Sequence, residues 1–84
     1  MTKVKKVGPK ARKYHYNFNF KRGNYFSVSH ELEEKFPKLF SGSGLCLFNG
    51  AFDVGFICTA ADARKIRRHV AINHPRAKVT RSEA

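Results

Sequence analysis

The sequence is short of acidic residues, with six Asp and Glu against 17 Lys and Arg among 84 residues and a formal net charge of +11. It has no tryptophan, only two cysteines, and no apolar run of the roughly 20 residues that a membrane-crossing helix needs. Its first residues also lack the apolar segment of a secretory signal peptide. These absences argue against a membrane protein and a disulfide-rich secreted scaffold, so we expect a cytoplasmic protein with reduced thiols.

The positive charge is concentrated in two parts of the chain. Six of the 17 basic residues lie in residues 1–13 and seven in residues 64–81, whereas half of the acids are Glu31, Glu33 and Glu34. A surplus of this size favours a polyanionic partner, through long-range attraction and the release of counterions. We expect that partner to be nucleic acid, with an acidic protein surface as the second candidate.

Composition divides the chain into three parts. Residues 1–13 form a flexible basic arm, residues 14–75 a single α+β domain, and residues 76–84 a flexible tail. The two ends are rich in charge and have little to bury, which is typical of segments that order only on contact with a partner. A folded part of this size buries only about 60% of its unfolded surface, so its stability should be modest.

The first half of the domain begins with strict alternation over residues 14–20, which predicts a strand. The loop Arg22-Gly23-Asn24 then predicts a hairpin with a second strand over residues 25–28. Ser29 is the expected N-cap of a first helix, which Pro37 kinks or divides. Residues 41–44, Ser-Gly-Ser-Gly, are expected to be a flexible connector.

The second half carries a hairpin and a helix in direct succession. Asn49-Gly50 predicts a two-residue turn that pairs Leu47 with Phe52. Thr59 is the expected N-cap of a helix over residues 60–73, which ends before Pro75. The apolar side of this helix is Ala63, Ile66 and Val70.

Together these elements predict an α+β fold in the order ββαββα, with a four-stranded antiparallel sheet and two helices packed on one face. The expected buried face is Tyr16, Phe18, Phe20, Phe26, Val28, Leu45, Leu47, Phe52, Val54 and Phe56. The other face should be bare, with Tyr25, Phe48 and Ile57 among Asn17, Asn19 and Lys21. Such a mixed face suits base stacking, solvent contact or a homodimer.

Two groups of residues are candidates for metal binding or catalysis, but other features of the sequence argue against both functions. Cys46, Cys58, His69 and His74 have the residue types of a zinc finger, but eleven residues separate the cysteines, so we expect no metal or other cofactor. His15 and His30 become neighbours in the predicted hairpin and form a candidate ribonuclease pair. No carboxylate is placed to orient either histidine, so we expect no enzyme.

The sequence therefore predicts a small, non-enzymatic protein that binds DNA or RNA through phosphate contacts from the second helix and the basic arm. The predicted contact residues are Lys5, Lys6, Lys10, Arg12, Lys13, Lys21, Arg22, Arg64, Lys65, Arg67, Arg68, Arg76 and Lys78. The alternative is an adaptor or inhibitor, of the kind a phage or mobile element encodes, that binds an acidic surface of a larger protein or nucleoprotein complex. Neither reading decides between DNA and RNA.

Overall fold

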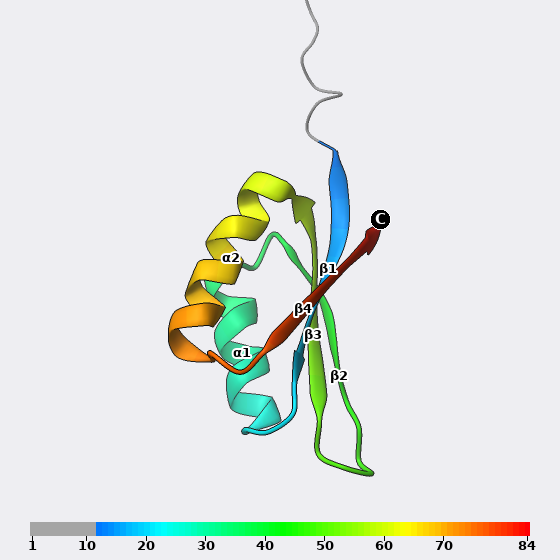
Figure 1. Ribbon diagram of the computed structural model, residues 1–84, viewed down its shortest axis with the longest axis vertical. Coiled ribbons are helices and arrows are strands. Elements are labelled where there is room, and N and C mark those ends of the chain that lie inside the picture. Colours follow the sequence, from blue (N-terminus) through cyan, green and yellow to red (C-terminus); the bar gives the residue numbers. More distant parts are fainter. Residues whose placement is uncertain (1–11) are drawn as a thin grey trace, which may run out of the picture.

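A computed structural model describes residues 12–84, and these form one four-stranded sheet with two helices on one of its faces (Figure 1). The elements follow in the order β1 (Lys13–Phe20), α1 (Tyr25–Lys35), β2 (Phe40–Leu45), β3 (Phe52–Thr59), α2 (Ala60–Asn73) and β4 (Lys78–Glu83). The strands lie in the order β2-β3-β1-β4, and all neighbours are antiparallel. The predicted α+β fold with a four-stranded antiparallel sheet is confirmed. The predicted arm lies outside the described residues except for Arg12 and Lys13, and Lys13 begins β1.

Two β-α-β units interleave to give this sheet. One unit connects β1 to β2 through α1, and the other connects β3 to β4 through α2. In the sheet, the two strands of each unit are separated by one strand of the other unit. As a result α1 packs over β2 and β3, while α2 packs over β3 and β1. Within residues 12–84 neither helix packs on β4, so this edge of the sheet lies beyond the helical layer.

The segment after β1 differs from the prediction, because residues 25–28 begin α1 and do not form a strand. Asn24 is the N-cap, and its side chain accepts a hydrogen bond from the Ser27 amide at 2.9 Å. Tyr25, Val28 and Leu32 have helical spacing and face the sheet, whereas Phe26 is 75% exposed. The helix ends at Lys35, so Pro37 lies beyond it and kinks nothing.

The segment expected to be a flexible connector is strand β2, which pairs with β3 through a bulge between Phe40 and Gly42. Leu45 opposes Phe52, so the hairpin register differs by two residues from the prediction. Residues 46–51 form the turn: the Gly50 amide donates to the Cys46 carbonyl at 2.9 Å and the Cys46 amide to the Ala51 carbonyl at 2.8 Å. This wider turn leaves Leu47 in solvent, where the prediction had buried it.

The expected flexible tail contains the fourth strand. β4 pairs with β1 from Tyr14 opposite Glu83 to Asn19 opposite Lys78. Val79 packs against the core, and the Arg81 guanidinium lies 4.6 Å from the centre of the Tyr14 ring. The strand replaces the one predicted for residues 25–28, so the elements run βαββαβ.

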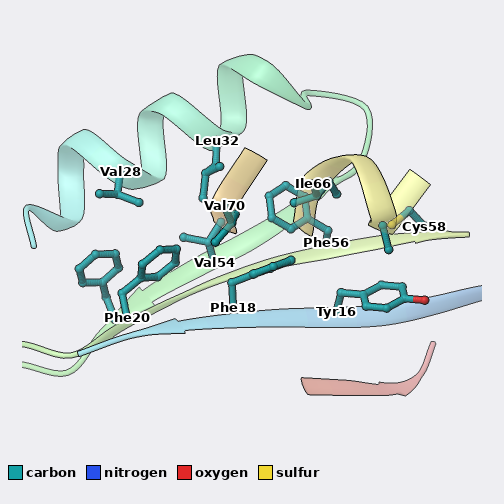
Figure 2. Packing of buried hydrophobic residues seen from close by; sticks show 12 residues of the cluster. Tyr16, Phe18, Phe20, Val28, Leu32, Val54, Phe56, Cys58, Ile66 and Val70 are labelled. Carbon is teal, nitrogen blue, oxygen red and sulfur yellow. The ribbon is translucent and has the colours of Figure 1, made fainter. Parts of the chain in front are cut away.

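The core lies between the sheet and both helices (Figure 2). Phe18, Phe56, Leu32 and Ile66 are at most 2% exposed and come from β1, β3, α1 and α2 respectively. The Phe18 and Phe56 rings meet edge to face, with centroids 5.8 Å apart. Burial of this kind, at about 25 cal/mol per Å² of apolar surface, is the main stabilising contribution. It holds both helices in fixed positions on the sheet.

The uncovered face of the sheet is polar rather than aromatic. The partly exposed side chains of His15, Asn17 and Asn19 alternate with the buried residues of β1. A Cβ at Gly55 would lie 2.9 Å from His15 Nε2, so this position has no room for a side chain unless His15 moves. Of the aromatic residues predicted here, Tyr25 lies on α1 and Phe48 in the hairpin turn. No helix within residues 12–84 is long and apolar enough to cross a bilayer.

Candidate functional site

A cleft runs between α2 and β4, at the sheet edge that the helices leave uncovered. It has a volume of about 330 Å³ and is lined by Tyr16, Ala60, Ala63, Arg64, Arg67, Val79, Thr80 and Arg81. We call it the α2–β4 cleft. Three of its eight lining residues are arginines, so its character is cationic.

The arginines of the cleft are positioned by residues that the core fixes. Ala63, Ile66 and Val70 anchor α2 on the sheet, which directs Arg64 and Arg67 toward the β4 side of the helix. On the opposite wall, pairing with β1 and contact with Tyr14 hold Arg81. Among residues 12–84 none of these three arginines forms an ion pair. Their guanidinium groups therefore retain their hydrogen-bonding capacity for a ligand.

A second recess lies at the end of the sheet where α2 turns into β4. It has a volume of about 530 Å³ and is lined by Phe20, Lys21, Arg22, His74, Pro75, Arg76 and Ala77. We call it the loop-end recess. Lys78 follows it directly as the first residue of β4 and leads toward Arg81. Only Lys78 separates the recess, which ends at Ala77, from the cleft, which begins on β4 at Val79, so the two hollows together form one cationic edge.

The other predicted contact residues are distributed differently. Lys5, Lys6 and Lys10 lie outside the described residues. The Arg12 guanidinium donates to Glu83 at 2.7 Å, a hydrogen bond that raises the pKa of Arg12 and satisfies part of its charge. Lys65 lies 4.0 Å from Asp62, and the exposed Arg68 lines neither hollow. Lys13 begins β1 opposite Thr59.

Arg81 is the cleft residue that the sequence prediction missed. The sequence carried one signal for it, the alternation of Ala77, Val79 and Arg81, which places all three on one side of an extended chain. That alternation has a single large apolar member, so it is weak beside the polar composition of the tail. The strand becomes evident only through its pairing with β1.

Three of the six acids lie on the opposite flank of the helical layer. Glu31, Glu33 and Glu34 are all on α1, which covers β2 and β3. Glu31 accepts hydrogen bonds from His69 Nε2 at 2.6 Å and from His74 Nε2 at 3.2 Å. Burial raises the pKa of Glu31, but the hydrogen bonds from the two histidines outweigh it and the pKa is lowered. This carboxylate joins α1 to α2 and does not line the α2–β4 cleft.

His69 lies between Glu31 of α1 and Asn73 of its own helix. The Asn73 side-chain amide donates to the His69 carbonyl at 2.9 Å and lies 3.3 Å from His69 Nδ1. His69 and His74 therefore serve the contact between the helices.

The two histidines of the ribonuclease hypothesis are not neighbours. His15 lies on the uncovered face of the sheet, where its ring nitrogen Nε2 is close to Gly55. His30 lies on α1, on the other face, where its Nε2 is 3.3 Å from Glu34. Their predicted proximity was wrong because it rested on residues 25–28 forming a strand beside β1.

The two cysteines are in different surroundings. Cys46 is exposed in the hairpin turn and Cys58 is buried in the core. Burial, with a smaller contribution from the nearby Asp62 carboxylate, raises the pKa of the Cys58 thiol. Within residues 12–84 no group of three His, Cys, Asp or Glu side chains is arranged to hold a metal ion.

Comparison with known proteins gives no relative for this chain: no family model, curated protein or solved structure matches it.

Proposed function

We propose that this protein binds nucleic acid without catalysing a reaction, and that its cationic edge holds the phosphates. The observation that carries the proposal is the α2–β4 cleft, where Arg64, Arg67 and Arg81 converge with no ion pair among the described residues. Arginine suits phosphate because its planar group donates two parallel hydrogen bonds to two oxygens. A cytoplasmic location, where nucleic acid is accessible and free thiols stay reduced, belongs to the same proposal.

Charge separation across the molecule supports this function. The cations of α2 and β4 lie on one flank, and the three glutamates of α1 lie on the other. A polyanion is therefore attracted to one flank and repelled by the other, so it approaches in a preferred orientation. A chain that needed charge only to stay dissolved would gain nothing from this arrangement.

The test compares two double variants that remove the same charge from different places. Arg64→Ala with Arg67→Ala removes both arginines from the α2 wall of the cleft. Lys35→Ala with Lys38→Ala removes two cations at and just beyond the end of α1. We expect the intact chain to bind oligonucleotides with a slope of log K against log salt near −5, for about six phosphate contacts. The arginine variant should reduce the magnitude of that slope by about 2 and weaken binding at least tenfold.

The lysine variant is the control and should change the slope by less than about 1. Equal losses in the two variants would show that net charge alone drives binding and would remove the cleft from the proposal. Fluorescence anisotropy with single-stranded RNA, single-stranded DNA and duplex DNA at several salt concentrations gives all of these quantities.

One observation favours the adaptor as a second candidate function. β4 is an edge strand, so one side of its backbone has no partner strand within residues 12–84, and it carries Lys78 and Arg81. An acidic extended segment of another protein could pair with this edge as a fifth strand. A synthetic Glu-rich peptide that binds in the micromolar range and displaces no oligonucleotide would favour this candidate.

A further inference from the structure

The hairpin turn between β2 and β3 exposes two large apolar side chains. Leu47 is 90% exposed and Phe48 is 97% exposed, which makes them the most exposed large hydrophobic residues in the described chain. We call residues 46–51 the hairpin tip. Adjacent apolar side chains left in water at this extent usually mark a contact surface.

The tip is an ordered structure. Two backbone hydrogen bonds close the turn, from Gly50 to Cys46 and from Cys46 to Ala51. The Asn49 side chain accepts a third from the Ala51 amide at 2.9 Å, and Gly50 adopts a positive φ of 77°. Leu47 and Phe48 are therefore presented on a fixed turn, which lowers the entropy lost when they bind.

Two cationic loops lie at the same end of the sheet as the tip, and the acid Asp53 of β3 lines a hollow together with Cys46 and Ala51 of the tip. The loops 21–24 and 74–77 lie at the same end of the sheet, and Figure 1 shows the β2–β3 hairpin extending beyond both. These two loops contain Lys21, Arg22 and Arg76, and none of the three loops at this end contains an acid. The apolar tip, the loop-end recess and the start of the cationic edge thus lie at the same end of the sheet.

From this juxtaposition, and resting on the function proposed above, we propose that the hairpin tip contacts the faces of nucleobases while the cationic edge holds the phosphates of the same strand. Phe48 would stack on a base and Leu47 would pack beside it. Aromatic and aliphatic side chains contact bases in this way in single strands and in kinked duplexes, with Arg and Lys on the flanking phosphates.

A flexible polymer fits this surface better than a membrane or a protein pocket does. The α2–β4 cleft lies between a helix and an edge strand of the sheet. The β2–β3 hairpin, which carries the tip, projects at one end of the molecule (Figure 1). A flat anionic membrane cannot reach both at once, but a nucleic acid strand can bend from one to the other. Two side chains are also far fewer than the 20–30 residues that each partner of a typical stable protein interface contributes.

The experiment uses the full chain and oligonucleotides that carry 2-aminopurine, a base whose fluorescence changes on stacking, in single-stranded and duplex form. The test variant is Leu47→Ala with Phe48→Ala. The control is Phe26→Ala, which removes an exposed aromatic ring from α1. All three substituted residues are exposed, so near-native folding is expected and is checked by circular dichroism and chemical unfolding.

We expect the intact protein and Phe26→Ala to alter 2-aminopurine fluorescence, and the tip variant to lose this effect. Its affinity should fall about 5- to 100-fold, the range of one base-stacking contact. Its salt slope should be unchanged, because no cation is removed. A response with single strands alone identifies stacking on unpaired bases, and one with duplex as well identifies insertion between paired bases.

Unchanged fluorescence and affinity in the tip variant would overturn this inference. If Arg64→Ala with Arg67→Ala still weakened binding, the proposed function would stand without it. If the intact chain bound no oligonucleotide, both would fall. Tip-dependent binding to phosphatidylserine vesicles, with no base response, would overturn the inference in favour of a lipid surface.

Discussion

The two helices cover the same face of one sheet, but their flanks differ in charge and in what lies beside them. Helix α1 carries half of the acids and lies over the edge strand β2, to which hydroxyl groups tie it. Helix α2 carries four cations and leaves its neighbouring edge strand β4 uncovered. Edge strand β2 is thus covered by a helix on one face, whereas edge strand β4 is not. The β4 edge is where arginines that form no ion pair within residues 12–84 converge.

Each helix is held on the sheet by a buried side chain, so truncating that side chain in either helix should lower the free energy of unfolding by a similar amount. Leu32 of α1 and Ile66 of α2 are both fully buried. Leu32→Ala and Ile66→Ala should each lower the free energy of unfolding by about 2–5 kcal/mol, through lost transfer energy and a residual cavity. This is a large part of the roughly 5–15 kcal/mol typical of a domain.

Urea unfolding followed by circular dichroism measures both losses. A cost below about 1 kcal/mol for Ile66→Ala alone would contradict the fixed position of α2, and with it the fixed geometry of the cleft. Ile72→Ala, on the exposed side of the same helix, is the control and should change stability by less than about 0.5 kcal/mol.

Ser43 of β2 makes the side-chain hydrogen bonds that join α1 to this strand. Its hydroxyl lies 2.9 Å from the Tyr25 hydroxyl and 3.0 Å from that of the buried Ser29. Ser43→Ala should cost about 1 kcal/mol, because two hydrogen bonds are lost and Ser29 loses its partner. Ser41→Ala is the matched control on the same strand, since Ser41 makes no side-chain hydrogen bond within residues 12–84. Equal unfolding curves for the two variants would show that the hydroxyls do not fasten α1.

The smallest expected effect concerns Glu31, which joins the two flanks. Because its pKa is lowered in the folded protein, its contribution to stability is complete above its usual pKa of 4.5 and is lost as the pH falls through the folded pKa. Glu31→Gln should therefore cost a constant amount at neutral pH, below about 1 kcal/mol for a partly exposed carboxylate. That cost should shrink between about pH 5 and pH 3.

Unfolding of the intact protein and the variant at a series of pH values isolates this term, since the other carboxylates contribute equally to both. A difference that stays constant down to pH 3 would contradict the role of His69 and His74 in lowering the pKa of Glu31.

Local signals in the sequence predict α2 almost to the residue. Thr59 is the N-cap, the buried side chains are Ala63, Ile66 and Val70, and the helix ends before Pro75, all as expected. Each of these signals acts within a few residues of the place it determines. The apolar alternation of β1 and β3 is likewise local, so the buried residues of both strands were predictable.

The errors arise where a short segment fits two patterns or depends on a distant partner. Phe26 and Val28 alternate as in a strand, yet Val28 and Leu32 have helical spacing, and the Asn24 cap and burial on the sheet favour the helix. β4 forms because its backbone pairs with β1, about sixty residues earlier in the chain. The cleft is affected in the same way: Arg64 and Arg67 were predicted as contact residues, whereas Arg81 on the opposite wall was not.

The junction between β3 and α2 has no linker, and this restricts how the molecule can move. Thr59 is the last residue of β3, where it opposes Lys13, and it also accepts a hydrogen bond from the Asp62 amide as the cap of α2. The helix is thereby continuous with the central strands and has no hinge at its start. Any widening of the α2–β4 cleft must come from β4, which is joined to α2 by residues 74–77. If the cleft binds ligands of different thickness, β4 would move to fit them while α2 stays in place.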